Sequence, residues 1–233
     1  MVRVRRYSMS ENIKNIVEIN LPKNNKQFGT IEAYKNLRTN LLYTENLKVI
    51  MLTSTIPNEG KTVSAYHLAE SFAEIGKKVL LIDCDLRGSF LKKYLVVKGE
   101  VEGLSEMLTN QASKIINETN IENLDVVLSG KIPPNPSELL SSNLFKFFIK
   151  NAKENYDYVI IDTPPVAVAS DSVIVGRIVD GVVLVIRNDF IKKNAVKRVK
   201  LELERNGSRI VGVVLNRVNK DQVDYKDYAY NNY

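Results

Sequence analysis

The chain of 233 residues contains one cysteine, one histidine and no tryptophan. A single cysteine, Cys84, excludes an internal disulfide framework and fits a reducing compartment, and its apolar surroundings predict a packed thiol. A zinc site is excluded by the shortage of histidine and cysteine ligands, so we expect His67 to pack on a helix. No signal peptide and no apolar run long enough to cross a bilayer is apparent, so any membrane attachment is expected through a partner.

The composition predicts one sizeable core in a single domain, because 44% of the residues are hydrophobic. The net charge of +6 indicates an acidic partner, which could be a nucleotide, a nucleic acid or an anionic membrane face. Alternatively, the positive charge belongs to lysines dispersed over the surface, which only solvate it and bind no partner. We expect a flexible N-terminal arm over 1–27, one folded domain over 28–218 and a mobile tail over 219–233.

A strand, a tight loop and a helix are predicted around the run Gly60-Lys61-Thr62. In a phosphate-binding loop the glycine lets backbone N–H groups approach an oxyanion, the lysine reaches the outer phosphates and the threonine can hold Mg²⁺. The usual pattern has a glycine at the position of Thr55. The expected nucleotide contacts in this segment are Glu59, Gly60, Lys61, Thr62 and Val63.

Two further apolar strands, over 79–82 and 158–161, end in aspartates. Since ligands bind outside the carboxyl ends of parallel strands, Asp83, Asp85 and Asp162 are expected beside the phosphate loop. Oxygen ligands suit Mg²⁺, which places the ion on Thr62, Asp162 and Asp83. The predicted catalytic residues are Lys61, Asp83, Asp85 and Asp162.

The sequence allows more than one role for the two aspartates after the strand 79–82, and for Arg87. Asp83 is the best-placed proton acceptor for the attacking hydroxyl or water, and Asp85 could instead support the metal from behind its direct ligands. Arg87 could stabilise charge on the transferred phosphoryl group or simply pair with a carboxylate.

The remaining pattern predicts an α/β fold in which a mostly parallel sheet has helices on both faces. Helices are expected over 32–46, 170–179 and 191–205, together with one that begins at an N-cap, Ser137. Residues 99–123 are expected to hold a short helix around 104–108 and a second helical piece. Further strands are expected over 126–128, 182–186 and 210–215. The tail carries four tyrosines and few aliphatic residues: Tyr225, Tyr228, Tyr230 and Tyr233.

The chain resembles the bacterial tyrosine kinases of capsular and exopolysaccharide synthesis, in the form that is a separate cytoplasmic polypeptide in Gram-positive bacteria. Six segments carry this resemblance: the Walker A run 53–62, the Walker A′ run 81–87, the Walker B run 159–165, the helix 32–40, the run Pro133-Pro134-Asn135-Pro136-Ser137-Glu138-Leu139-Leu140, and the tail. The Walker runs alone fit partition and septum-positioning ATPases equally well. The resemblance implies the P-loop NTPase fold with this deviant Walker topology.

It further implies an ATP- and Mg²⁺-dependent kinase that phosphorylates its own tail tyrosines in trans. Protomers would form a ring-like homo-oligomer through Glu32, Lys35 and Arg38, and Asn216 would contact the adenine. Implied partners are a membrane-bound activator, a polysaccharide co-polymerase protein, which would hold the chain at the inner face of the cell membrane, and a tyrosine phosphatase. No nucleic-acid partner is expected.

Two departures from the family pattern stand out. Asn58 replaces a glycine, and asparagine tolerates left-handed backbone angles better than most residues. Lys35 replaces an arginine and lacks the planar fork that binds a carboxylate through two bonds. Two other functions are alternatives: a positioning ATPase, which needs a lysine early in the loop where this chain has Thr53, Ser54 and Thr55, and a non-enzymatic module that binds nucleotide to switch partners.

Overall fold

The computed structural model describes residues 16–19, 28–97 and 101–218. The helices are α1 (Phe28–Leu42), α2 (Lys61–Ala73), η1 (Leu91–Lys93), α3 (Leu104–Leu108), α4 (Pro136–Ser141), α5 (Asn143–Asn155), α6 (Asp171–Gly176) and α7 (Lys193–Arg205). The strands are β1 (Ile16–Ile19), β2 (Val49–Ser54), β3 (Val79–Asp83), β4 (Leu95–Val97), β5 (Ile116–Thr119), β6 (Leu124–Val127), β7 (Tyr158–Asp162), β8 (Gly181–Arg187) and β9 (Ile210–Asn216).

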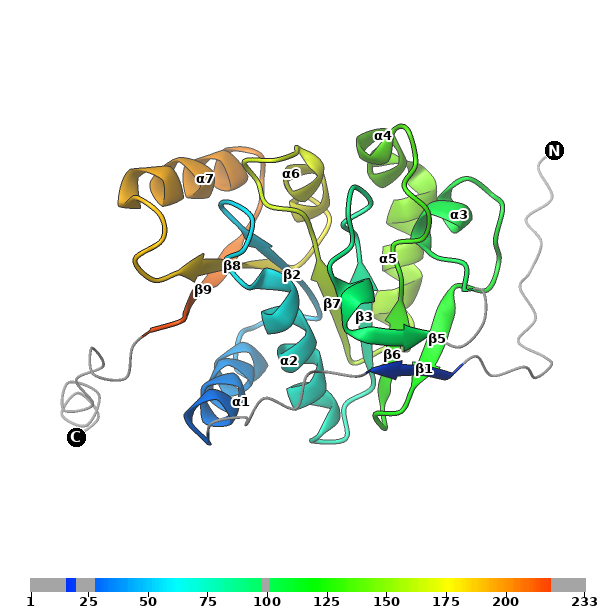
Figure 1. Ribbon diagram of the computed structural model, residues 1–233, viewed down its shortest axis with the longest axis horizontal. Coiled ribbons are helices and arrows are strands. Elements are labelled where there is room, and N and C mark those ends of the chain that lie inside the picture. Colours follow the sequence, from blue (N-terminus) through cyan, green and yellow to red (C-terminus); the bar gives the residue numbers. More distant parts are fainter. Residues whose placement is uncertain (1–15, 20–27, 98–100, 219–233) are drawn as a thin grey trace.

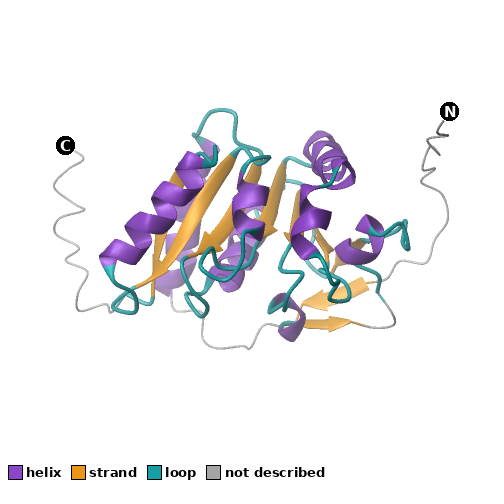
Figure 2. Cartoon of the chain, turned by 90° about the horizontal axis from the view of Figure 1, so that it is seen from above, coloured by secondary structure: helices purple, strands orange, loops and turns teal. Residues whose placement is uncertain are grey.

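These strands form one sheet in the order β4-β1-β5-β6-β3-β7-β2-β8-β9. The six strands from β6 to β9 in that order are parallel, and the β1–β4 and β5–β6 pairs are antiparallel. Helices α1 and α2 cover one face of the sheet, and α5, α6 and α7 cover the other (Figure 1). Figure 2 shows the twist of the strands between the two helical layers. The predicted α/β architecture is therefore confirmed.

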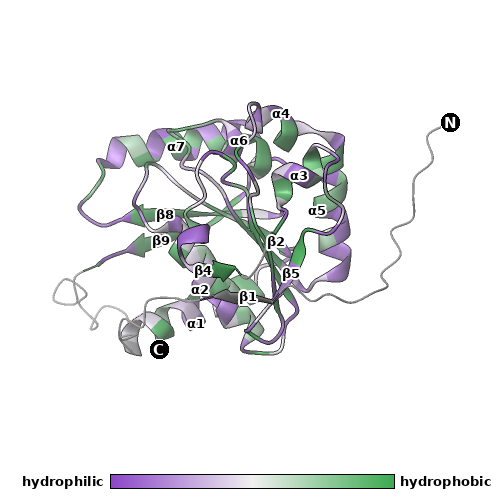
Figure 3. Cartoon of the chain, turned by 45° about the vertical axis from the view of Figure 1, so that its right-hand side comes forward, coloured by the Kyte–Doolittle hydropathy of each residue, from purple (hydrophilic) through white to green (hydrophobic). Residues whose placement is uncertain are grey.

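The core consists of two apolar clusters, one on each face of the sheet. Side chains alternate between the faces along a strand, so Val49 and Met51 of β2 join one cluster and Ile50 and Leu52 join the other. Every residue of β2 is buried. This two-sided burial explains why the central strands have continuous apolar sequences, which colour the middle of the molecule green in Figure 3.

Three local predictions were wrong. Residues 16–19 lie within the expected N-terminal arm, but they form β1, which pairs with both β4 and β5. The second helical piece expected within 99–123 is the strand β5. Ser137 does not cap a helix: α4 begins at Pro136, and Ser142 caps the separate helix α5 by accepting the Phe145 N–H at 3.2 Å.

The sheet register places the functional strand ends together. Asp83 at the end of β3 lies opposite Asp162 at the end of β7, and Asp162 lies opposite Leu52 of β2. The loop that follows β2 therefore begins beside both carboxylates. This edge of the sheet holds the candidate site.

Candidate functional site

The loop between β2 and α2 has the backbone of an anion cradle. Gly60, directly before α2, has φ of +93°, a conformation that favours glycine. Asn58 also adopts positive φ, at +67°, as its tolerance of left-handed angles predicts. Lys61 and Thr62 open α2, so the positive end of the helix dipole faces the loop.

Glu59 braces this loop from within. Its carboxylate is fully buried and accepts the N–H groups of Thr55 at 2.7 Å and Ile56 at 2.9 Å on one oxygen. The other oxygen accepts the N–H of Arg187 at 3.2 Å, which ties the loop to β8. The carboxylate therefore holds the loop in shape. The nucleotide contact predicted for Glu59 stays a proposal, and it would be made by the backbone of this residue.

Asn216, at the end of β9, lies against the same loop. Its side-chain amide donates to the Glu59 carbonyl at 2.9 Å and accepts the Arg217 N–H at 2.9 Å. A Cβ atom on Gly60 would lie 2.0 Å from the Asn216 amide nitrogen. The close approach therefore requires glycine at position 60.

Thr62 and Asp162 form the most direct contact between the loop and the strand ends. The threonine hydroxyl donates to Asp162 at 2.7 Å. Burial raises the pKa of Asp162, although Lys61 and Thr62 both act to lower it. A hydroxyl beside a carboxylate is the oxygen donor set that Mg²⁺ uses together with phosphate oxygens, so these residues fit the ion. Among the residues with described positions, no group of three or more histidine, cysteine or acidic side chains could hold a metal by itself.

Asp83 is fully buried and held through both oxygens. One oxygen accepts the Asp85 N–H at 3.0 Å, and the other accepts the Ser89 hydroxyl. Burial, with the neighbouring charge of Asp162, raises the pKa of Asp83 to about 7. A carboxylate that titrates near neutral pH can accept a proton there.

Lys61 is the cation of this cluster. Its ammonium lies 3.4 Å from Asp85 and 3.4 Å from Asp162. Burial would lower the pKa of Lys61, but the negative charges of Asp162, Asp85 and Asp83 outweigh it and hold that pKa above its usual value. The ammonium therefore stays charged beside these carboxylates.

Arg87 pairs with a carboxylate, as one of the two roles predicted for it requires, and its role toward a phosphoryl group stays a prediction. It donates through Nε at 2.8 Å and Nη2 at 3.1 Å to the buried Asp171 at the start of α6. Ser137 of α4 donates to Asp171 at 2.6 Å and accepts from Arg87 at 3.0 Å. Three elements that are distant in sequence are thereby joined beside the site.

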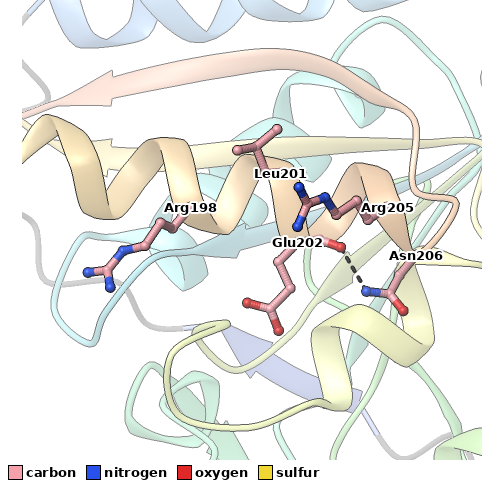
Figure 4. Close-up of a pocket in the computed structure, with 5 residues that line it drawn as sticks. All are labelled: Arg198, Leu201, Glu202, Arg205 and Asn206. Carbon is pink, nitrogen blue, oxygen red and sulfur yellow. Dashed lines mark hydrogen bonds between the residues drawn. The ribbon is translucent and has the colours of Figure 1, made fainter.

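The phosphate loop opens into a cleft of about 310 Å³. Its lining combines the loop with the segments after β3 and β7: Pro57, Asn58, Gly60, Lys61, Thr62, Val63, Asp85, Arg87, Gly88, Phe90, Pro164, Pro165 and Val168. Most of the predicted binding residues thus line one cavity. A second hollow, of about 440 Å³, is formed by the outer side of α7 and the turn after it, from Arg198 to Asn206 (Figure 4). Its residues come from one helix end, and none belongs to the strand-end cluster.

The predicted oligomer residues lie on α1, the helix that packs against α2. Lys35 and Glu32 form a half-exposed ion pair at 3.6 Å, the ordinary result of their spacing. Arg38 instead donates to the Ser71 carbonyl of α2 at 2.7 Å, which fixes α1 on its own domain. The tail tyrosines Tyr225, Tyr228, Tyr230 and Tyr233 fall outside the described residues.

The single cysteine and the single histidine of the chain pack as predicted. Cys84 is fully buried, and burial raises the pKa of its thiol well above the usual value. His67 packs on α2 between Tyr34 and Tyr66, with ring centroids at 5.0 and 5.1 Å. Cys84 lies between Asp83 and Asp85, and its N–H donates to the Asp162 carbonyl at 2.8 Å, but its thiol takes no part in the hydrogen bonds described for the site.

Three residues of the site were not predicted to act there. Ser89 had no signal beyond its position six residues after Asp83. Asp171 opens a helix like many other acidic residues, and its partner Arg87 is 84 residues away. Ser137 was predicted as a cap because it precedes a helical pattern. Only the three-dimensional arrangement shows that it binds Asp171.

Together, the parallel sheet, the loop before α2 and the two strand-end aspartates define a P-loop nucleotide-binding protein. Residues 47–205 match the AAA domain family. The tyrosine-protein kinase CpsD of Streptococcus agalactiae is 40% identical over 204 residues, which cover 86% of this chain and 89% of that protein. The chain therefore belongs to the bacterial tyrosine-protein kinase family.

Solved structures agree with this assignment. The kinase domain of the Escherichia coli tyrosine kinase ETK superposes with a TM-score of 0.79 and 31% identity, covering 94% of this chain and 86% of that one. The septum site-determining protein MinD of Pyrococcus horikoshii, complexed with Mg-ADP, has a TM-score of 0.64 at 23% identity, covering 76% and 72%. The second likeness bears on the fold alone and matches the predicted deviant Walker topology.

Within the described ranges, no helix has the length and apolarity needed to cross a membrane.

Proposed function

We propose that this chain is an ATP-dependent protein-tyrosine autokinase that modifies its own tail tyrosines in trans. The observation that carries the proposal is the single rim formed by Lys61, Thr62, Asp83 and Asp162, in a chain 40% identical to a tyrosine-protein kinase. The proposed acceptors are Tyr225, Tyr228, Tyr230 and Tyr233. The kinship with tyrosine kinases favours this function over a positioning ATPase or a nucleotide-switched module.

In the proposed reaction, a tyrosine oxygen attacks the γ-phosphorus of ATP while the bond from that phosphorus to the bridging β,γ-oxygen breaks. ADP leaves, and the phenolic proton passes to Asp83, whose pKa of about 7 suits an acceptor at neutral pH. Lys61 neutralises the outer phosphates, and Gly60 lets backbone N–H groups contact them. Thr62 and Asp162 would hold Mg²⁺, which offsets the phosphate charge. Asp83 is proposed as a further ligand of the ion, but to serve as one it would have to release a hydrogen bond, since both of its oxygens already accept one.

The finer contacts of the nucleotide belong to the same proposal. Asn216 would contact the adenine, since it lies against the loop at Gly60. This contact requires its amide to leave the Glu59 carbonyl or to share its bonds, because both amide atoms are paired. Asp85 would keep Lys61 in place until phosphate arrives.

The partners also belong to the proposal. Self-association would use the half-exposed Glu32 and Lys35, whereas Arg38 supports them by holding α1 against α2. A membrane-bound activator, acting as the polysaccharide co-polymerase, would bring the chain to the inner face of the cell membrane, and a tyrosine phosphatase would reverse the modification. The process served would be capsular or exopolysaccharide synthesis and export.

The decisive test is Lys61→Ala. Incubated with Mg·ATP and the cytoplasmic segment of the activator, the wild-type chain gains phosphotyrosine within its tail, read by mass spectrometry. Lys61→Ala lowers the labelling rate by about 100-fold or more, because the outer phosphates lose their cation. Lys150→Ala, at an exposed lysine of α5, serves as the matched control and labels normally. Unchanged labelling of Lys61→Ala would show that the assignment is wrong.

A further inference from the structure

The positive charge of the chain is concentrated in the segment 187–209, which runs from the last residue of β8 through α7 to the residue before β9. This segment has eight lysine and arginine side chains against three acidic ones, a surplus of five, whereas the whole chain has a net charge of +6. The rest of the chain is therefore almost neutral. Lysines that only solvate a surface would be spread more evenly, so this concentration indicates an anionic partner.

The cations of α7 and its N-cap are exposed and mostly unpaired. Six of them face the solvent: Lys192, Lys193, Lys197, Arg198, Lys200 and Arg205. Within the part of the chain that the structure describes, only Lys200 among these six has a carboxylate partner, Glu204 at 2.7 Å. Glu202 lies four residues after Arg198, a spacing that permits an ion pair, but the two side chains extend in different directions (Figure 4). Five positive charges therefore remain free for a partner.

The start of α7 carries charge of the unfavourable sign. Lys192 is the N-cap and Lys193 the first helical residue, at the end where the helix dipole is positive, and the first turn has no acidic residue. Cations near this end destabilise a helix by repulsion. The two lysines therefore do not serve the stability of α7, and their placement suits an anion supplied from outside the chain.

The shape of this surface favours a lipid bilayer over a single small anion. α7 packs on the sheet through the buried Val199 and Leu203, and it presents an open outer side about 20 Å long (Figure 1). Leu201, which is 48% exposed, lines the outer hollow together with Arg198 and Arg205. Long cationic side chains around an exposed leucine suit a headgroup layer, where phosphates lie next to the first carbons of the acyl chains. Nucleic acid offers no apolar layer for the leucine.

We propose that the outer side of α7 is a docking surface for an anionic lipid bilayer. The cations that contact the phosphate headgroups are Lys192, Lys193, Lys197, Arg198 and Arg205. The inner leaflet of a cell membrane is negatively charged, and each lysine or arginine close to it strengthens binding by about fivefold. Because the contact depends on charge, it weakens as salt is added. It goes beyond the proposed function, since it requires neither nucleotide nor activator, and it would orient a chain that the activator already holds at the membrane.

The test measures binding of the full chain to vesicles, without nucleotide or activator. The wild-type chain co-sediments with vesicles of phosphatidylcholine and phosphatidylglycerol in equal parts, is released from them by raised salt, and does not bind phosphatidylcholine alone. The double variant Lys197→Gln/Arg198→Gln loses about 25-fold in affinity for the mixed vesicles, because two cations are removed. Lys146→Gln/Lys150→Gln, at two exposed lysines of α5, is the matched control: it removes the same charge on the same side of the sheet and binds as the wild type does.

Four results would each overturn the lipid surface. The first two are a wild-type chain that does not bind the mixed vesicles, or binds phosphatidylcholine equally well, and unchanged affinity in Lys197→Gln/Arg198→Gln. The third is an equal loss in both double variants, which would attribute binding to net charge. The fourth is tighter binding of duplex DNA than of mixed vesicles at the same salt, which would assign the surface to nucleic acid. Because no nucleotide is present, failure of the proposed kinase function would leave the vesicle results unchanged.

Discussion

Burial controls the chemistry of Asp83, the residue that links the site to the stability of the fold. The same low-dielectric surroundings that make a carboxylate a useful proton acceptor also oppose its charge in the folded state. Its pKa near 7 compares with about 4 in an unfolded chain. The folded protein therefore binds a proton that the unfolded chain has already lost between these two values. This residue destabilises the ligand-free fold as the pH rises.

Asp83→Asn should accordingly stabilise the protein without Mg²⁺ or nucleotide. A raised acid pKa favours folding below about pH 4, and that advantage is lost as the pH rises through about 7. The expected gain at pH 8 is on the order of 4 kcal/mol, falling to less than half at pH 5. Denaturant unfolding at both pH values measures it.

The control for this prediction is Asp189→Asn, at an exposed aspartate on the loop after β8. It removes the same charge without relieving burial, so its effect on the unfolding free energy should be small at either pH. A gain of equal size in both variants would attribute the effect to net charge and contradict the burial argument.

The sequence predicts those site residues that follow a strand or belong to the loop, and it misses those placed by packing. Lys61, Thr62, Asp83 and Asp162 are predictable because strand ends of a parallel sheet must meet. Arg87 is predictable as a charged neighbour, but its partner Asp171 is not. Nothing local distinguishes an aspartate that opens a helix toward solvent from one buried against a distant guanidinium.

Helix α3 shows how a short element is fixed by its ends. Glu106 accepts the Gly103 N–H at 2.9 Å and the Ser105 hydroxyl at 3.1 Å, and it also accepts the Lys131 N–H at 3.0 Å from the loop after β6. Burial acts to raise the pKa of Glu106, but these hydrogen bonds prevail and hold it below its usual value. One carboxylate thus caps α3 and ties it to the loop that leads to α4.

Glu106→Ala should lower the free energy of unfolding at pH 7 by about 2 kcal/mol, because a charged acceptor of several hydrogen bonds is lost. The difference from wild type should shrink as the pH falls through the lowered pKa, since protonation removes the same acceptor. Chemical unfolding at pH 7 and pH 3 measures both values. Glu102→Ala, at an exposed glutamate two residues before α3 begins, should change little; an equal loss there would refute the capping role.

Element prediction succeeded where periodicity and burial agree and failed where pairing decides. The strands β2, β3 and β7 are continuous apolar runs, and only a sheet covered on both faces hides them. The strand β5 has no such run: its sequence is Ile-Asn-Glu-Thr, and it is a strand because β6 and β1 supply hydrogen-bond partners. β1 likewise depends on β4 and β5, which lie about 80 to 100 residues further along the chain.

At the scale of the whole molecule, the last strand before the tail ends beside the candidate site. β9 ends at Asn216, whose amide contacts the phosphate loop, and two residues separate it from the tail, 219–233. Fully extended, the fifteen residues of the tail span at most about 50 Å, so the length of the tail does not by itself select one site. Distance alone therefore does not decide between modification in cis and in trans. The family resemblance favours trans, and two complementary chains can test it.

The acceptor is the Lys61→Ala chain, which keeps its tail tyrosines but lacks the phosphate cation. The donor is a chain with Tyr225, Tyr228, Tyr230 and Tyr233 changed to phenylalanine, which keeps its site. With Mg·ATP and the activator segment, neither should gain tail phosphotyrosine alone, and the mixture should label the acceptor at a rate that rises with donor concentration. Mass spectrometry separates the two tails by sequence. If wild type labels itself at a rate per molecule independent of its concentration and the mixture stays unlabelled, each tail must return to its own site.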